Sequence, residues 1–446
     1  MTGAERIAAF AAQTFVEGVP EEVLDAAHLH LLDALGVGIA SSTVADNADW
    51  AGAAPAGSAS LLSGGTAEAG AAAMINGALI HALEYDDTHI GSVVHGSAVA
   101  APVALAVAQL AGASGCDLIR AYIVAWEVAI RIGLAAPGAF QAHGFQVTSV
   151  GGAIGAAAAA AQVLGLDAAR AVSAIGIAGG QASGTLAFLA DGAMSKALNP
   201  GWAARTGIDA VRLARAGMTG PASVLDSAFG VMNTFAGGGE MLGPQLATLG
   251  QEWLIPQAAF KLYPCCHYIH PFLEAIESLM CKGVTAQDFT SLNAFVPPPA
   301  APLVCEPWAR RQTPVSGYDG KWGLAYCMAL MLVDGRVDVA SFNTAPRAEV
   351  IEVARKMTWT PMRDHGFPER FAARIELETG QGTISAEVTQ VRGAPDRPVE
   401  ITDVRGKFAA NAGLRYCPEE VSELALEILE IGSAADTCRL SNLLCA

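Results

Sequence analysis

The chain carries little charge, and little positive charge in particular. Charged residues make up 15% of its 446 residues, and 26 Lys and Arg stand against 43 Asp and Glu, for a formal net charge of −17. Nucleic acids and anionic membranes are bound through a footprint of Lys and Arg. Neither is therefore expected as a partner. A small anionic substrate needs only a few local cations and stays open.

Signals for disulfides, secretion and membrane insertion are also missing. The nine cysteines, an odd number, are scattered without a repeated C-x-x-C spacing, which is unlike a disulfide framework. No basic N-terminal segment leads into an apolar run. The most apolar stretches, residues 98–111 and 150–165, fall short of the ~20 strongly apolar residues that a membrane span needs. We expect a cytoplasmic protein without a membrane partner.

Apolar and small side chains are abundant instead. Apolar residues make up 52% of the chain, and there are 48 glycines, which is enough for more than one core. Residues 1–255 show one helix pattern after another, with starts at Pro20, Ser114 and Asp167. No strand pattern is evident in that part.

The composition changes near residue 256. Residues 373–378 and 383–388 alternate between apolar and polar side chains around a Gly-containing turn, which predicts a β-hairpin. A helix start follows at Cys417.

These patterns predict a mainly α fold in two domains. Residues 1–255 form a large all-helical domain that residues 405–446 complete. Residues 256–404 form a smaller α+β lid domain.

The densest group of titratable side chains lies in residues 81–95, between segments typical of Ala/Val/Leu helices. Desolvating so many polar groups is costly, which favours a functional role. Five of them supply a proton acceptor and hydrogen bonds to a carboxylate or carbonyl, namely Asp86, Asp87, Thr88, His89 and His95. Two alternatives stay open. Carboxylates and imidazoles also suit Zn or Mn, although no H-x-x-x-H or C-x-x-C spacing is present. The two aspartates also suit helix caps.

A second polar segment runs into an Ala-rich helix. Thr148, Ser149 and the free N–H groups of a helix start would receive a substrate carboxylate. Alternatively, Gly151, Gly152 and Gly155 serve close helix packing. A dinucleotide site is not expected, because no strand precedes these glycines and no GxGxxG is present.

Two lysines stand close to apolar segments. Lys196 is isolated in an apolar region. Burial would lower its pKa and suit it as a base or electrophile, whereas snorkelling to the surface is the alternative. Lys261 begins a segment near the predicted domain junction, where ligand clefts tend to form. That segment also resembles a metal cluster, with Cys265, Cys266, His267 and His270, but adjacent cysteines do not readily bind one ion.

Other cations have simpler interpretations. Glu127 stands four residues before Arg131, which favours an internal ion pair over a substrate clamp. A cationic stretch suits either a carboxylate clamp or a solvated loop, and it comprises Arg310, Arg311, Tyr318 and Lys321.

Several separated motifs together resemble the MmgE/PrpD family over nearly the whole chain. In order they are Ala82-Leu-Glu-Tyr-Asp-Asp-Thr88, His95-Gly-Ser-Ala, Gly115-Cys-Asp-Leu-Ile-Arg-Ala, Trp126-Glu-Val-Ala-Ile-Arg131, His143-Gly-Phe, Lys196 with Pro200-Gly201, and Lys261-Leu-Tyr-Pro-Cys-Cys266. The family includes 2-methylcitrate dehydratase, cis-aconitate decarboxylase and iminodisuccinate epimerase. The resemblance implies a large helical domain, a smaller α+β lid domain, a homodimer, and no metal or organic cofactor.

The resemblance also implies roles for single residues. The active-site acid falls on Glu84, the loop threonine on Thr88, the loop histidine on His95, and the two active-site lysines on Lys196 and Lys261. We expect the acid, the histidine and the lysines to be catalytic. The expected substrate-binding residues are Thr88, Asp87, His89, His143, Gln146, Thr148, Ser149, Tyr263 and Cys266.

Three positions depart from the family pattern. Glu84 stands where members often have Asp, and the loop from Thr88 to His95 is one residue longer than in the decarboxylase. Gln146 stands where many members have a second histidine. Glutamine cannot shuttle a proton, which leaves His143 or Tyr263 to compensate.

The predicted chemistry is removal of a proton α to a carboxylate of a small di- or tricarboxylate. A positioned base must take the proton, while cations or N–H groups hold the enediolate-like product. Loss of hydroxide then makes a dehydratase, loss of carbon dioxide a decarboxylase, and return of the proton to the other face an epimerase. Because Gln146 removes an acid, an epimerase of an iminodisuccinate-like substrate is favoured. The alternatives are a 2-methylcitrate-type dehydratase, a cis-aconitate-type decarboxylase, a non-catalytic carboxylate-binding protein and a metal-dependent lyase.

Overall fold

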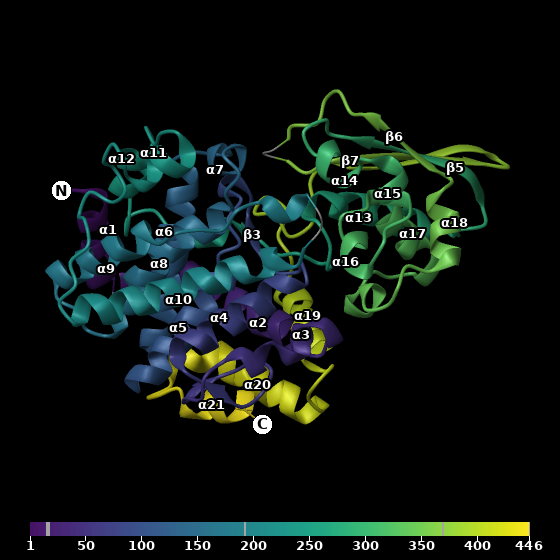
Figure 1. The fold of residues 1–446 in the computed structure, drawn as a ribbon. Coiled ribbons are helices and arrows are strands. Elements are labelled where there is room, and N and C mark those ends of the chain that lie inside the picture. Colours follow the sequence, from purple (N-terminus) through teal and green to yellow (C-terminus); the bar gives the residue numbers. More distant parts are fainter. Residues whose placement is uncertain (15–17, 191–192, 368–369, 446) are drawn as a thin grey trace. The chain divides into compact units, whose positions relative to one another are not determined.

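The chain forms two compact units (Figure 1). The computed structural model describes residues 1–14, 18–190, 193–367 and 370–445. The first of the two compact units, here called the helical unit, comprises Met1–Ala82, Asp86–Ala259 and Glu400–Ala446. The second, the α+β unit, comprises Leu83–Tyr85 and Phe260–Val399. The predicted fold class is confirmed, since the structure is mostly helical and combines a large helical domain with a smaller α+β domain.

The helical unit contains both long helices and short turns of helix. Its α-helices are α1 (Gly3–Gln13), α2 (Glu21–Ser42), α3 (Ala45–Ala48), α4 (Ala69–Ala82), α5 (Ser97–Ala111), α6 (Gly115–Leu134), α7 (Ala139–Ala142), α8 (Val147–Val163), α9 (Ala168–Gly180), α10 (Ser195–Arg215), α11 (Val231–Ala236), α12 (Leu242–Ala247), α19 (Ile401–Ala412), α20 (Pro418–Glu430) and α21 (Cys438–Cys445). Its 3-10 turns are η2 (Asp49–Ala53), η3 (Ile90–Ser92), η4 (Ala187–Leu189), η5 (Ile255–Gln257) and η8 (Ile431–Ser433).

Four two-residue strands were not predicted for this unit. They form two antiparallel pairs, β1 (Ala59–Ser60) with β2 (Thr66–Ala67) and β3 (Thr88–His89) with β4 (Ala258–Ala259). A strand of two residues is too short to show the alternation by which strands are predicted.

Two of the predicted helix starts, Ser114 and Asp167, are confirmed by side-chain caps. The Ser114 hydroxyl accepts a hydrogen bond from the Asp117 N–H, and the Asp117 carboxylate accepts one from the Ser114 N–H at the start of α6. Asp167 caps α9 in a similar way through the Arg170 N–H. Each cap satisfies an N–H group that the first turn of a helix leaves without a partner.

Small residues bring the helices of this unit into backbone contact. A Cβ atom added to Gly201 in α10 would lie 2.0 Å from the Met74 carbonyl oxygen of α4. One added to Gly77 in α4 would lie 2.6 Å from the Gly201 Cα. No larger side chain fits between the two helices there. The Ala/Gly-rich sequence therefore places the first turns of α10 directly against α4.

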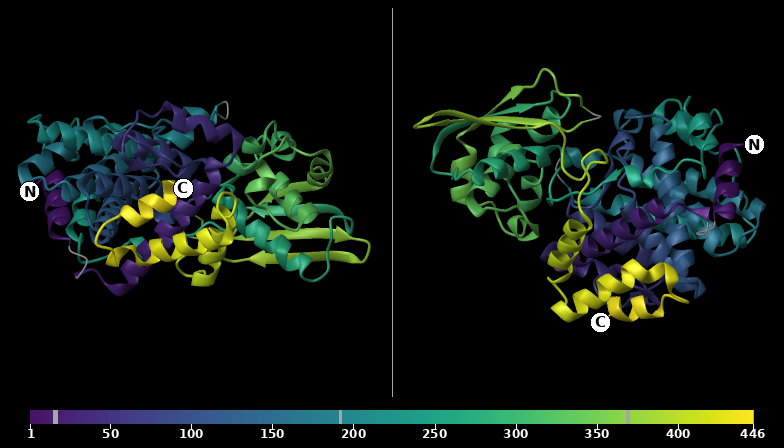
Figure 2. Two further views of the ribbon diagram at one scale, coloured as in Figure 1. Left: turned by 90° about the horizontal axis from the view of Figure 1, so that it is seen from below. Right: turned by 180° about the vertical axis from the view of Figure 1, so that it is seen from behind.

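The C-terminal helices belong to the helical unit. Figure 2 shows α19, in yellow, beside the purple α2, and both views agree. Within this unit α2 is long and apolar enough to cross a membrane by length and composition alone. However, 72% of its most apolar window is buried inside the fold, as in a core helix.

The α+β unit combines short helices with a four-stranded sheet in the order β6-β5-β7-β8. Its strands are β5 (Phe289–Val296), β6 (Met357–Pro361), β7 (Ala373–Thr379) and β8 (Gly382–Val388). Its helices are α13 (His270–Met280), α14 (Ala301–Val304), α15 (Trp308–Gln312), α16 (Gly317–Gly320), α17 (Leu324–Asp334) and α18 (Ala348–Ala354), and its 3-10 turns are η6 (His267–Ile269) and η7 (Val339–Phe342). Strands β5 and β6 are parallel and the other pairs antiparallel.

The predicted hairpin is confirmed as the pair of β7 and β8. On β7, Ile375 and Leu377 are fully buried, whereas Arg374 and Glu378 are exposed. This alternation is the period of two that a strand with one buried face requires.

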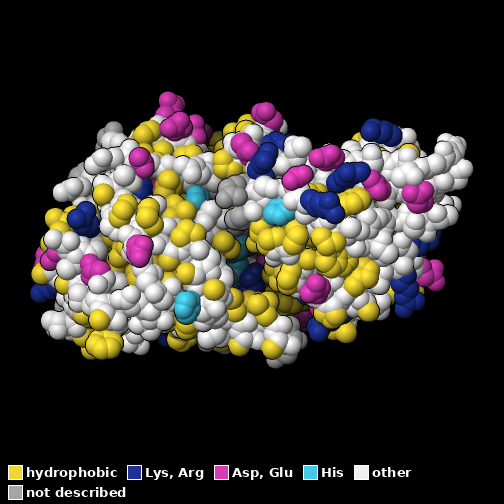
Figure 3. Space-filling model, turned by 90° about the horizontal axis from the view of Figure 1, so that it is seen from above, with side chains coloured by type: hydrophobic (Ala, Val, Ile, Leu, Met, Phe, Trp, Pro, Cys, Tyr) yellow, Lys and Arg dark blue, Asp and Glu magenta, His cyan; other side chains and the backbone are white. Residues whose placement is uncertain are grey.

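The low charge of the sequence is visible on the surface. On the face that Figure 3 shows, Lys, Arg, Asp and Glu side chains stand in small groups between apolar and uncharged surface.

Candidate active site

The Asp86 carboxylate lies between two imidazoles in the helical unit. Its Oδ2 atom is 2.7 Å from Nδ1 of His81, at the end of α4, and 3.7 Å from Nδ1 of His95. The two rings meet edge to face, with centroids 4.9 Å apart. The His81 and Asp86 side chains are fully buried, and that of His95 is 12% exposed. A carboxylate at this distance favours the protonated form of His95.

The hydrogen bonds of His95 determine which ring nitrogen is the base. Nδ1 lies 2.9 Å from the Asp87 carbonyl oxygen and 3.1 Å from the Thr88 hydroxyl. Because a carbonyl oxygen only accepts hydrogen bonds, Nδ1 carries a proton. A neutral His95 therefore holds its lone pair on Nε2. The His95 backbone N–H donates to the Thr148 hydroxyl at 3.0 Å, so both threonines position this histidine.

A row of side chains continues from His81 to α10. Gln146 Nε2 lies 2.9 Å from His81 Nε2, and Asn199 Nδ2 donates to Gln146 Oε1 at 2.8 Å. The Ser149 hydroxyl donates to the Asn199 backbone carbonyl at 3.0 Å. Sequence reasoning did not select His81 or Asn199. His81 stood within the titratable stretch, which was a usable signal, whereas nothing in the sequence pointed to Asn199.

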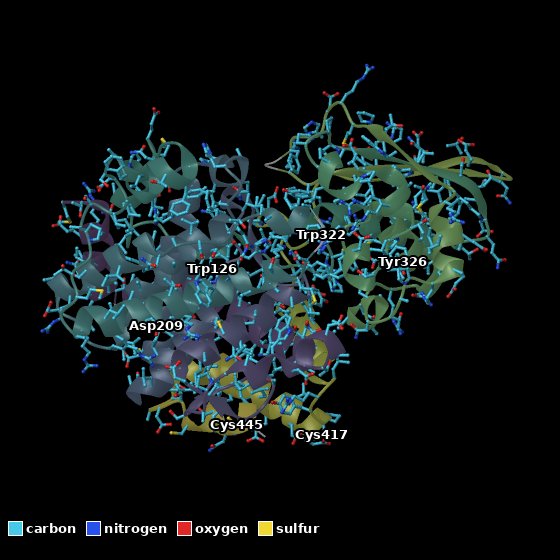
Figure 4. The ribbon with its side chains drawn as sticks, in the orientation of Figure 1. Trp126, Asp209, Trp322, Tyr326, Cys417 and Cys445 are labelled. Atoms are coloured by element: carbon cyan, nitrogen blue, oxygen red, sulfur yellow. The ribbon has the colours of Figure 1, made fainter. Side chains whose placement is uncertain are left out.

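Asp87 belongs to a second buried network. Its Oδ2 lies 2.8 Å from His30 Nδ1 and also accepts from the Ser97 hydroxyl, while Oδ1 accepts from the Ser97 N–H. The Ser97 hydroxyl in turn contacts the Tyr122 hydroxyl at 2.6 Å and Trp126 Nε1 at 3.1 Å. Burial raises the pKa of Tyr122 well above its usual value. Figure 4 shows Trp126 among the helices of this unit. Asp87 therefore holds the start of α5, which favours the capping alternative for this residue.

Lys196 is buried in the first turn of α10, so it does not snorkel to the surface. Asn199, which bonds Gln146, follows three residues later in the same helix. Residues at this spacing are neighbours on one helix face. Lys196 thus lies on the same face of α10 as Asn199, whose side chain bonds Gln146.

Two of the predicted histidines make local contacts. His89 is buried, and its Nδ1 accepts a hydrogen bond from the Ser92 N–H at 3.2 Å. Burial lowers its pKa to about 4. His143 is exposed, and its Nδ1 lies 2.8 Å from the Ala139 carbonyl oxygen, one turn earlier. His89 thus caps the turn η3, and His143 stands at the end of α7 rather than in the Asp86 cluster.

The start of α8 uses its small residues for packing. A Cβ atom added to Gly155 would lie 2.5 Å from the Ala125 carbonyl oxygen of α6. The hydroxyls of Thr148 and Ser149 bond His95 and Asn199 of the same unit. These contacts support the close-packing interpretation of this segment.

The ion pair predicted for α6 is confirmed. Arg131 lies 3.5 Å from Glu127, and both side chains are buried. Arg131 also donates to the Gln245 and Glu252 carbonyl oxygens at 2.7 Å. It is therefore a structural residue.

In the α+β unit, Lys261 and Glu84 lie together. Lys261 Nζ donates to the Glu84 carbonyl oxygen at 3.3 Å and lies 4.0 Å from Glu84 Oε2, and both side chains are buried. The backbone of Glu84 is left-handed, with φ 55°. This conformation is costly for a residue with a Cβ atom and tends to occur at functional sites. The Tyr85 hydroxyl donates to the Leu262 carbonyl oxygen at 3.1 Å, and this is a second link between the same two segments of the chain.

The solvated-loop alternative is wrong for Lys321. It is buried, and its Nζ donates to the carbonyl oxygens of Leu83 at 2.8 Å and Pro264 at 3.0 Å. Burial lowers its pKa to about 8. Lys321 is thus not part of a solvated loop, whereas its neighbours Arg310 and Arg311 pair with an aspartate.

Tyr263 and Cys266 are both buried in the α+β unit. Burial raises the pKa of the Cys266 thiol to about 12 and raises that of the Tyr263 hydroxyl as well. A buried neutral thiol is a poor nucleophile and metal ligand. Cys266 therefore contributes shape rather than charge to its surroundings.

One group in the described part of the chain has the composition of a metal site, and it is His81, Asp86 and His95. Its potential ligand atoms lie within 4.8 Å of one another. The 2.7 Å between His81 Nδ1 and Asp86 Oδ2 is a hydrogen-bond distance. A hydrogen bond between the two side chains therefore accounts for their contact in this structure.

Comparison with known proteins assigns the chain to a family. The MmgE/PrpD N-terminal domain matches residues 5–242, and the MmgE/PrpD C-terminal domain matches residues 263–431. The chain belongs to the MmgE/PrpD family.

Curated proteins that are similar to this chain include cis-aconitate decarboxylases. The Aspergillus terreus enzyme is 28% identical over 98% of this chain and 94% of its own length. The cis-aconitate decarboxylase-like protein oryM of Aspergillus oryzae is 29% identical over 95% of this chain and 93% of its own length. The human cis-aconitate decarboxylase is 28% identical over 83% of this chain and 78% of its own length. The family is thereby confirmed, and its members are enzymes.

Proposed function

We propose that this chain is an enzyme that moves a proton at the carbon next to a carboxylate of a small di- or tricarboxylate, without a metal or organic cofactor. The observation that carries the proposal is the fixed tautomer of His95, whose Nδ1–H bonds the Asp87 carbonyl oxygen. When the C–H bond breaks, the proton passes to Nε2 and the electron pair enters the carboxylate as an enediolate. Asp86 then stabilises the imidazolium that forms.

The lysines supply the positive charge that an enediolate needs. Lys196 is a buried cation of the helical unit, and Lys261 a buried cation of the α+β unit. Preorganised cations of this kind contribute most where water is excluded. The resemblance to the family assigns both lysines, with Glu84, to the same reaction.

We favour epimerisation of an iminodisuccinate-like substrate. Gln146 is held by Asn199 and His81 through its amide, and an amide is no acid at neutral pH. Expelling hydroxide needs an acid beside the leaving group. In an epimerase the proton leaves one face and a second group returns a proton to the other, a task for which His95 and a lysine suffice.

A lyase is the second candidate, because the relatives favour it. Cis-aconitate decarboxylases match this chain over 83% to 98% of its length. In that reaction a C–C bond breaks, carbon dioxide leaves, and the remaining electron pair takes up a proton at carbon. A 2-methylcitrate-type dehydratase and a non-catalytic carboxylate-binding protein are the remaining alternatives.

Proton NMR in D₂O tests the proposal. The protein is incubated with iminodisuccinate stereoisomers, cis-aconitate, 2-methylcitrate and citrate. Deuterium at the α-carbon with scrambled stereochemistry and no alkene supports the epimerase. Loss of cis-aconitate with carbon dioxide release supports the decarboxylase, and a growing vinyl signal from 2-methylcitrate the dehydratase. No change in any substrate contradicts the proposal.

Two variants connect the activity with the site. We expect His95→Gln and Lys196→Ala each to lower turnover at least 100-fold, the usual contribution of a positioned acid or base. His143→Gln is the matched control and should retain activity, because His143 stands outside the cluster. Substrate binding by Lys196→Ala with unchanged affinity, and no turnover by the parent, would instead identify a binding protein.

The remaining expectations are a homodimer and a cytoplasmic location. Light scattering coupled to size exclusion tests the first, and cell fractionation tests the second.

A further inference from the structure

We propose that Gln146 is a positioning residue that keeps His81 neutral, so that the negative charge of Asp86 is kept for His95. The effect on turnover rests on the proposed function. The protonation state of His81 does not, and it is measured separately.

The orientation of the Gln146 amide is the first step. Asn199 Nδ2 donates to Gln146 Oε1 at 2.8 Å, so the amide oxygen faces α10. The amide nitrogen then faces His81 Nε2 at 2.9 Å. An amide nitrogen only donates hydrogen bonds. His81 Nε2 must therefore accept and carry no proton.

The second step concerns the other nitrogen of the same ring. With Nε2 as acceptor, the ring proton of neutral His81 resides on Nδ1 and is donated to Asp86 Oδ2 at 2.7 Å. A second proton on Nε2 would point at the N–H groups of Gln146. The glutamine therefore excludes the imidazolium form, which the adjacent Asp86 carboxylate would otherwise stabilise.

The third step leads to His95. A neutral His81 orients the Asp86 carboxylate but does not cancel its charge. The charge remains to stabilise a proton on His95, whose Nδ1 is 3.7 Å away. A histidine in place of Gln146 can both donate and accept, so it would not impose one tautomer on His81. Glutamine held by Asn199 does.

Nitrogen NMR of the histidine-labelled protein reads the tautomer directly. The ¹⁵N shifts of a ring distinguish a protonated from an unprotonated nitrogen, and His81→Asn assigns the signals of residue 81. We expect one protonated nitrogen, Nδ1, and one unprotonated nitrogen, Nε2, at neutral pH. Two protonated nitrogens, or a proton on Nε2 alone, would overturn the proposal.

Gln146→Glu tests the consequence. The introduced carboxylate accepts a hydrogen bond, so we expect both nitrogens of His81 to become protonated and turnover to fall at least 10-fold with little change in KM. Gln181→Glu makes the same charge change at an exposed position and should change neither. Gln146→Asn, which keeps an amide, should retain more activity than Gln146→Glu.

The two parts of the experiment separate two kinds of failure. A doubly protonated His81 in Gln146→Glu with unchanged turnover would overturn the link from Asp86 to His95. The expected tautomer in a parent protein that converts no substrate would contradict the proposed function and leave the protonation of His81 established. Circular dichroism and the melting temperature verify that each variant is folded.

Discussion

Lys407 Nζ lies 2.7 Å from Asp33 Oδ1 and 3.0 Å from Oδ2, and both side chains are buried. The pair joins α19 to α2, and its two residues are 374 positions apart in the chain. Burial lowers the pKa of Lys407 and raises that of Asp33, while the attraction between the two charges opposes both shifts. A buried ion pair thus ties the C-terminal segment of the helical unit to α2.

Lys407→Met should strongly destabilise the helical unit. Removing one partner leaves a buried carboxylate without its counter-charge, which costs about 3 to 5 kcal/mol. Urea unfolding followed by circular dichroism measures this loss. The double variant Lys407→Met with Asp33→Leu should recover most of it, because no lone charge remains. Arg439→Met, in an exposed pair with Glu423, is the matched control and should cost far less, because water and salt screen an exposed ion pair.

His89 should make the folded protein sensitive to acid. Its pKa is about 4 in the folded chain and 6.5 in the unfolded chain. Between these values the unfolded state binds the extra proton, so stability falls as the pH drops from 6.5 to 4, by roughly 3 kcal/mol at most. Unfolding free energies of the parent and of His89→Gln at pH 7 and pH 4.5 isolate this effect. Equal losses in both proteins would refute it.

Lys321 should make stability change with pH in the same direction, but in the alkaline range. Its pKa is about 8 when folded, against 10.5 when unfolded. Between pH 8 and 10.5 the unfolded chain holds the proton more often, so this residue makes the folded state more stable as the pH rises, by roughly 3 kcal/mol at most. Other groups also titrate in this pH range. Their contribution cancels in the difference between the unfolding free energies of the parent and of Lys321→Met. A difference that does not change with pH would show that Lys321 is not desolvated as described.

Chelation should leave the activity unchanged. His81, Asp86 and His95 have the residue types of a metal site, but the proposed tautomer places a proton on His81 Nδ1. We expect full turnover after dialysis against EDTA and no gain on adding Zn²⁺ or Mn²⁺. Loss of turnover that only a metal restores would favour the metal-dependent lyase and identify these three residues as ligands.

Much of the secondary structure was predictable because its causes are local. The cap formed by Ser114 and Asp117 and the alternation along residues 373–388 involve neighbours in sequence. Strand β5 was missed, although it pairs with both β6 and β7. Its first residues do not alternate strictly between buried and exposed side chains, and residues 297–299 after it are prolines, which are typical of a loop.

The candidate site was predictable only in its residue types. The concentration of acids and imidazoles in residues 81–95 was visible in the sequence, as was the isolation of Lys196. The roles were not. Asp87 holds the start of α5 through Ser97, whereas Asp86, its neighbour, faces two histidines. Consecutive side chains diverge in a turn, and no pattern of residue types states which one faces the cluster.

The helical pattern of residues 1–255, the hairpin and the family resemblance follow from the sequence alone, because periodicity, caps and motifs are properties of consecutive residues. The contact of Gln146 with His81, 65 positions earlier, and its orientation by Asn199 from another helix depend on the folded structure. The distance between the donor and the acceptor of a hydrogen bond can vary by only a few tenths of an ångström. That precision comes from the packing of α4, α8 and α10, which no single segment encodes.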